Sequence, residues 1–209
     1  MQTLYKNIVA ILLVCCGFGD SIAQTNIYNN NKTITLRKTT KVYVNGSYYN
    51  GVDSSNIDNK ADILSEGEVH LTGDIVNYAN NKLFKSDSGR VVFCGDAIQI
   101  IRGASSIHFQ QLQVNKTGGA VQANADFVVM DSLLLDSGNI NLVSGDLDLK
   151  STGILLNERD SARVYGNGEI FVKRFSFYGL NDNIAGIGVY LDSMNKQFTV
   201  IRGHSSQTN

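Results

Sequence analysis

The chain has 209 residues with 20 glycines, no proline and no tryptophan, and its formal net charge is −1. It has no basic tract that could neutralise phosphates, so we expect no nucleic-acid partner and no electrostatic docking on an anionic membrane. Glycine supplies turns with positive φ, and a chain without proline can place nearly every backbone N–H in a β ladder. The composition therefore favours short β strands joined by polar turns.

Residues 1–23 form a predicted export signal. Lys6 supplies the positive start, residues 8–18 are apolar, and Ser21 and Ala23 provide the small residues of a cleavage site. The apolar run is too short to cross a hydrocarbon core of about 30 Å. We therefore expect a secreted or outer cell-surface protein that does not span a membrane after cleavage, with residues 24–209 as the mature domain.

The mature chain reads as a succession of β strands with no helix longer than one turn. Alternating or short apolar runs are closed by turn residues such as Asn45-Gly46, which favour strands over helices. The predicted strands cover residues 33–36, 41–44, 68–72, 91–93, 97–101, 164–165, 169–174, 187–191 and 198–201.

The clearest pattern is a repeat in residues 106–156. Phe109, Phe127 and Leu147 open comparable apolar runs spaced ~18–20 residues apart. No run is long enough to form a core alone, so stacking of successive copies is the natural way to bury them. We therefore predict an all-β solenoid with rungs of that length. An open antiparallel β-sandwich remains the alternative, and it would show consecutive strands paired as hairpins.

Three motifs follow one another in a fixed order. They are Gly73-Asp74 with Asn77; then Gly89, Val91, Phe93 and Gly95; then Phe109, Leu112, Val114, Lys116, Gly118 and Gly119. This order resembles the β-solenoid segments of large, adhesin-like surface proteins of Bacteroidota, over residues 41–202. The resemblance implies a right-handed parallel β-helix, and such proteins are often substrates of type IX secretion.

The C-terminal residues of the chain carry no predicted capping element. The polar segment 204–209 directly follows the strand pattern of residues 198–201. Because an exposed final rung invites edge pairing, solenoids normally need a cap. We therefore expect the β-solenoid domain to be the N-terminal part of a longer protein whose downstream domains are missing.

Acidic residues in the repeat raise the possibility of an enzyme. Clustered carboxylates on stacked rungs could serve as acid and base in polysaccharide cleavage. The Asp-Ser-Gly, Ser-Gly-Asp and Asp-Leu-Asp contexts instead favour turns, where Asp bonds to local backbone. The residues concerned are Asp126, Asp131, Asp136, Asp146 and Asp148. The turn interpretation is favoured, so we assign no catalytic residue.

Histidine and cysteine supply no predicted metal or cofactor site. His70 and His108 lie inside strands, His204 lies near the end, and no metal-ligand spacing joins them. Cys94 is the lone cysteine of the mature chain, and its apolar setting predicts a buried, unreactive thiol. We expect no cofactor and no metal.

Aromatic residues raise the possibility of glycan binding. Flat rings on a sheet can stack on sugars, although rings that stack on one another or close the core are the simpler expectation. Adjacent rings at positions 48 and 49 must point to opposite faces of a strand. The candidates are Tyr43, Tyr48, Tyr49, Tyr78, Phe175, Phe177 and Tyr178.

Three Asp-Ser dipeptides resemble the O-glycosylation acceptor pattern of exported Bacteroidota proteins. The acceptors would be Ser132, Ser161 and Ser193. Together these features predict an exported structural or adhesive module without catalytic activity, whose partners are glycans or surface proteins. The alternative is a β-helix protein that binds or degrades polysaccharide.

Overall fold

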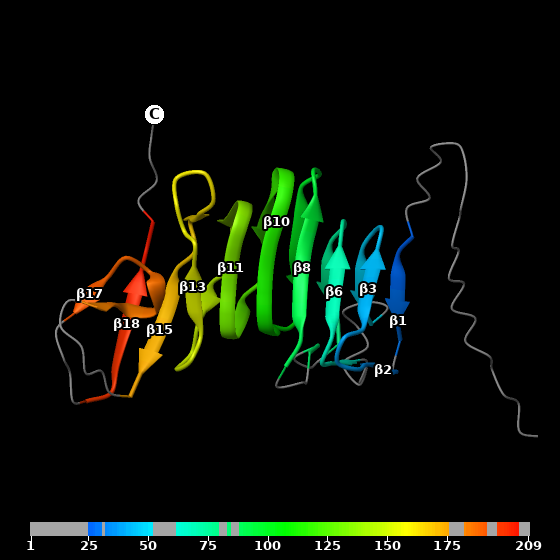
Figure 1. Cartoon of the computed structure of the whole chain (residues 1–209), viewed down its shortest axis with the longest axis horizontal. Helices are drawn as coiled ribbons and strands as arrows, with labels where there is room; N and C mark the ends of the chain where they lie inside the picture. The colour runs from blue at the N-terminus through cyan, green and yellow to red at the C-terminus, as the bar shows by residue number, and fades with distance from the viewer. Residues whose placement is uncertain are drawn as a thin grey trace, which may run out of the picture.

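The computed structural model describes residues 25–30, 32–51, 62–79, 83–84, 88–175, 182–191 and 196–204. The predicted signal peptide lies outside these ranges. The described strands follow one another along the long axis of the molecule, from β1 at one end to β17 and β18 at the other (Figure 1). The strands are β1 (Ile27–Asn29), β2 (Thr33–Leu36), β3 (Lys41–Val44), β4 (Tyr48–Asn50), β5 (Asp62–Ser65), β6 (Glu68–Leu71), β7 (Ile75–Asn77), β8 (Arg90–Gly95), β9 (Gln99–Gly103), β10 (Ile107–Ala123), β11 (Phe127–Leu142), β12 (Leu147–Asp148), β13 (Ile154–Leu156), β14 (Val164–Gly166), β15 (Ile170–Arg174), β16 (Asp182–Asn183), β17 (Tyr190–Leu191) and β18 (Phe198–Arg202); a 3-10 turn, η1, covers Ile184–Gly186.

The strands form a parallel β-solenoid of about six turns with three faces. Face A stacks β3, β6, β8, the middle parts of β10 and β11, and β13. Face B stacks β1, β4, β7, β9, the ends of β10 and β11, and β14. Face C carries β2 and β5 and, farther along, the starts of β10 and β11, β12 and β15. The parallel register confirms the predicted solenoid and excludes the antiparallel sandwich.

Columns of apolar side chains form the core because each coil repeats the same inward positions. On face A, one column runs from Val69 through Leu112 and Leu133 to Leu155. On face C, Phe127 is in register between Ile107 and Leu147, and all three are fully buried. Burial of such side chains is worth about 1.5–3 kcal/mol each, so the columns are the main source of stability.

Coil length varies along the solenoid. Asp146 follows Asp126 by 20 residues at equivalent corners, as the sequence repeat predicts. Nearer the N-terminal end, Asn77 lies 27 residues after its stacked neighbour Asn50. Because loops between strands can lengthen without disturbing the inward columns, the regular spacing is limited to the central coils.

The turn η1 and strand β18 close the last coil, which corrects two expectations from the sequence. β18 pairs antiparallel with β15, and η1 packs on β13 with Ile184 and Ile187 buried. The predicted strand over residues 187–191 is wrong except at Tyr190–Leu191, because positive φ at Ala185, Gly186 and Gly188 bends the chain into a turn. The expected absence of a capping element is also wrong, whereas downstream domains remain a prediction.

Within the described ranges, no helix has the length and apolar character needed to cross a bilayer.

Candidate functional site

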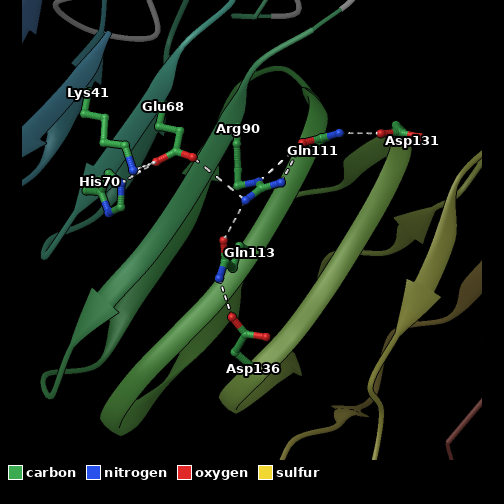
Figure 2. A network of polar contacts seen from close by, with 8 residues as sticks. All are labelled: Lys41, Glu68, His70, Arg90, Gln111, Gln113, Asp131 and Asp136. Carbon is green, nitrogen blue, oxygen red and sulfur yellow. Dashed lines mark hydrogen bonds and ion pairs between the residues drawn. The ribbon is translucent and has the colours of Figure 1, made fainter. Parts of the chain in front are cut away.

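A network of polar side chains covers the outside of face A, and we call it the polar strip. Its members are Lys41, Glu68, His70, Arg90, Gln111, Gln113, Asp131 and Asp136, and they extend over five stacked strands (Figure 2). Glu68 lies between three basic groups. Its carboxylate is 2.9 Å from Lys41 Nζ, 3.1 Å from His70 Nε2 and 3.9 Å from Arg90 Nη1.

Arg90 carries the polar strip onto the next two strands. Its Nη2 donates to Gln111 Oε1 at 3.2 Å, and its Nη1 donates to Gln113 Oε1 at 3.4 Å. Each glutamine then donates its amide onward, Gln111 to Asp131 at 2.6 Å and Gln113 to Asp136. All the charged side chains of the polar strip therefore have partners within it.

The register of face A places these residues side by side. Lys41, Glu68, Arg90 and Gln111 occupy one outward position on four consecutive strands. Neighbouring parallel strands lie about 4.8 Å apart, so long side chains in such a row can reach one another. Of these residues, the sequence motifs point only to the aspartates and His70, because the row is recognisable only when the strand register is known.

Electrostatics keep the acidic centre of the polar strip ionised. Hydrogen bonds from Lys41 and His70 lower the pKa of the Glu68 carboxyl. The hydrogen bond and charge of Glu68 raise the pKa of Lys41 in return. A general acid must hold its proton near the working pH, and a lowered pKa opposes that role for Glu68.

A stacked aromatic pair joins Tyr43 to His70 of the polar strip, and the His70 side chain is only 18% exposed. The Tyr43 ring stacks on His70 with centroids 4.5 Å apart, and Tyr43 is 71% exposed. A shallow cavity of about 260 Å³ is lined by Thr40, Gly67 and Ser88 together with Lys41, Glu68, Arg90 and Gln111 of the polar strip. The arrangement offers a flat ring next to hydrogen-bonding groups that have fixed positions.

A second surface feature is a groove of about 420 Å³ on face C. His108, Asp148, Lys150 and Phe171 line it, together with Ser106, Asp126, Phe127, Val128 and Asp146. Asp148 pairs with Lys150. Stacking of the coils thus places Asp126, Asp146 and Asp148 along the same groove.

Two of these carboxylates support the backbone at the corners of the coils. Asp126 accepts the N–H of Asp146 at 2.9 Å, and Asp146 accepts the N–H of Glu169 at 2.8 Å. Each carboxylate therefore binds the backbone of the following coil. This is the turn role that their Ser-Gly-Asp and similar contexts predict.

The other predicted aromatic sites separate into inward and outward rings. Tyr48 is buried, whereas Tyr49 points outward and stacks on Tyr28 at 4.6 Å, which confirms opposite faces for adjacent rings. Tyr78 is half-buried. Phe175 is 63% exposed beneath Lys173 Nζ, and Phe177 and Tyr178 lie outside the described residues.

The predicted modification sites are scattered along the solenoid. Ser132 is half-buried on β11, Ser161 is exposed in the loop before β14, and Ser193 lies outside the described residues. Cys94 is partly buried and donates to Leu71 O, and burial raises the pKa of its thiol. His204 contacts Arg202 and Gly168 O at the end of the last coil.

In the part of the chain that the structure describes, no group of three or more His, Cys, Asp or Glu residues is placed to hold a metal ion.

Comparisons of the chain with protein-family models, curated proteins and solved structures found no match.

Proposed function

We propose that this chain is an exported structural or adhesive module that presents a stiff β-solenoid rod at the cell surface. The polar strip is the observation that carries the proposal. Its side chains hold one another in place across five strands, so face A offers a flat array of polar groups in fixed positions. Such an array makes many weak contacts with an extended partner at little cost in conformational entropy.

The chemistry of the polar strip favours presentation over catalysis. Its carboxylates are engaged with Lys41, His70, Arg90 and the two glutamines. Glycosidic cleavage by two carboxylates needs one that keeps a proton and one that is free to act as base or nucleophile. Glu68, with its lowered pKa, suits neither the acid role nor an unpaired base.

The test is adhesion of beads coated with the exported protein to arrays of glycans and surface proteins. We expect binding that falls in Tyr43→Ala and in His70→Ala, because the first removes the exposed ring and the second removes the ring that supports it. Phe175→Ala is the matched control, since it removes another exposed ring, which lies directly after β15 and outside the polar strip. Two results would contradict the proposal: beads with the protein that bind no better than uncoated beads, or binding that falls equally in Tyr43→Ala, His70→Ala and Phe175→Ala.

A glycan-binding protein is the second candidate, and the groove on face C favours it. The groove combines the Phe171 ring with His108, Asp148 and Lys150, which is the mixture of ring and polar groups that sugars require. Saturation-transfer NMR with neutral oligosaccharides should show contacts that Phe171→Ala removes. Turnover of any bound polysaccharide would instead favour the enzyme alternative.

A further inference from the structure

The outer edge of the last coil is covered by other parts of the chain, whereas each strand of the first described coil pairs with one other strand among the described residues. In a parallel pair, alternate residues of a strand direct their N–H and C=O to opposite neighbours. Just before β14, Arg163 O accepts a hydrogen bond from Ile140 N, so Arg163 faces β11. The next residue, Val164, therefore directs its N–H and C=O away from β11, where a following coil would lie.

An ion pair takes the place of that following coil. Glu158 Oε1 accepts the Val164 N–H at 3.0 Å, and Arg202 Nη2 donates to Val164 O at 3.4 Å. The two side chains also bind each other, with Nη1–Oε2 and Nη2–Oε1 distances of 2.5 and 2.7 Å. Each is only 19% exposed. The pair thus satisfies the outward donor and acceptor of an edge strand as a neighbouring strand would.

Arg202 also ties together the elements that cover the other two faces. It belongs to β18, which pairs antiparallel with β15 on face C. Its Nη1 donates to Ile187 O, immediately after the η1 turn that packs on β13 of face A. Gly186 of η1 lies so close to β13 that a Cβ there would be 1.9 Å from Leu155 O. The Arg202 guanidinium therefore contacts β14 and Ile187, and its own strand covers β15. We call β18, η1 and the Glu158–Arg202 pair the cap, because together they cover the ends of all three faces.

At the opposite end, the strands of the first coil are each paired with one other strand. β1 pairs with β4, β2 with β5 and β3 with β6, and no second strand pairs with β1, β2 or β3 among the described residues. Ile27 N donates to Ser47 O, so Ile27 faces β4 and Tyr28 directs its N–H to the outer edge. Because the strands of both ends run in the same direction, the first coil of one copy can continue the last coil of another.

We propose that the Glu158–Arg202 pair is a latch that keeps a second copy of this chain from docking on the last coil. With the latch open, the N–H of Tyr28 in the second copy takes the place of Arg202 on Val164 O. The contact is head-to-tail, so it repeats and produces rods of increasing length rather than a closed dimer. The surface covered by the cap is therefore an interaction surface whose partner is the first coil of the same chain.

To test this proposal, the whole reading frame is expressed and the protein is purified in the form that the host exports. Light scattering then measures the molar mass of the protein at increasing concentration. The parent should stay a monomer. Arg202→Met should keep its β circular dichroism and form species of twice the monomer mass and larger. Arg163→Met is the matched control, because the Arg163 side chain lies over the Tyr165 ring at 5.9 Å and does not touch the latch. This variant should remain monomeric.

A second substitution identifies the docking partner. Tyr28→Pro removes the outward N–H of β1 but leaves the bonds of Ile27 and Asn29 to β4. Added to Arg202→Met, it should abolish the association. Association that survives Tyr28→Pro contradicts the first coil as partner, and a folded, monomeric Arg202→Met protein contradicts the latch. If Arg202→Met unfolds, Glu158→Gln decides between the same outcomes, because it removes the negative charge that holds Arg202 over β14, whereas its amide oxygen can still accept the Val164 N–H.

Discussion

The buried pair of Gln99 and Lys116 gives the sharpest test of how the interior is held together. Gln99 is fully buried, and its amide donates to Leu71 O at 2.9 Å and to Gly73 O at 2.8 Å. Its Oε1 accepts from Lys116 Nζ at 2.5 Å, and Lys116, which is 3% exposed, also donates to Ala97 O at 2.8 Å. No carboxylate lies within ion-pair distance of this ammonium among the described residues.

Replacement of Gln99 by Leu should therefore cost much more than replacement of Lys116 by Met. Gln99→Leu takes the donor from two buried carbonyls and one acceptor from a buried ammonium, and each loss costs about 1 kcal/mol or more, giving a total of roughly 3 kcal/mol. Lys116→Met removes a cation that burial disfavours, since desolvation lowers its pKa, but leaves Gln99 Oε1 and Ala97 O without their donor. These effects oppose each other, so we expect a change of less than about 1 kcal/mol.

The measurement is the free energy of unfolding in urea for the parent, both single variants and the double variant. For a chain of this size, a loss of about 3 kcal/mol corresponds to roughly 6–12 °C in Tm. The double variant should be more stable than the sum of the single changes predicts, because no buried ammonium is left short of an acceptor. A Gln99→Leu protein as stable as the parent, or strictly additive changes, would refute the reasoning.

Four further predictions follow from particular contacts. Phe127→Ala should cost about 3–5 kcal/mol of unfolding free energy, because Phe127 is fully buried and packs edge-on against Phe109 at 6.2 Å; urea unfolding measures this, and a cost under about 1 kcal/mol would contradict the stacked core. Gly103→Ala should lower Tm clearly, because its Cβ would lie 2.1 Å from Asn77 O, whereas Gly203→Ala, with no atom within 4 Å of its Cβ, should leave Tm unchanged. Burial opposes ionisation of Glu158, but hydrogen bonds from Arg202 and from Val164 N lower the pKa of this carboxyl overall. The stability that Glu158 contributes is therefore present above pH 4.5 and is lost as the pH falls through its lower pKa in the folded chain. Urea unfolding against pH should show this loss in the parent and not in Glu158→Gln. Because burial raises the pKa of Cys94, its thiol should react slowly with iodoacetamide at pH 8 until the chain is unfolded, and equal rates before and after unfolding would show that the thiol is accessible.

The sequence predicts the central coils well because their information is local. Phe127 and Leu147 open runs that the structure places in register on face C, and Tyr48 and Tyr49 alternate inward and outward as a strand requires. The fold class follows from such runs, since no single run can bury its own apolar face.

Features that depend on contacts between distant coils could not be predicted in this way. Glu158 and Arg202 are 44 residues apart, and nothing in either segment signals the other. Likewise, Glu68 and Arg90 become neighbours only through the register of β6 and β8, which depends on the length of the intervening loops. The polar strip and the cap therefore appear only in the structure.

The most direct test of this account is the register of the parallel coils on face A, which places Gln113 beside Leu134. In a chain with Cys94→Ser, cysteines at positions 113 and 134 should form a disulfide on mild oxidation, because laterally adjacent Cα atoms fall within the roughly 4.4–6.8 Å that a disulfide spans. Cysteines at positions 113 and 135 should not, since Leu135 points into the core. Efficient closure of the 113–134 pair alone is the predicted result; closure of the 113–135 pair instead would contradict the stacked parallel solenoid on which the polar strip depends.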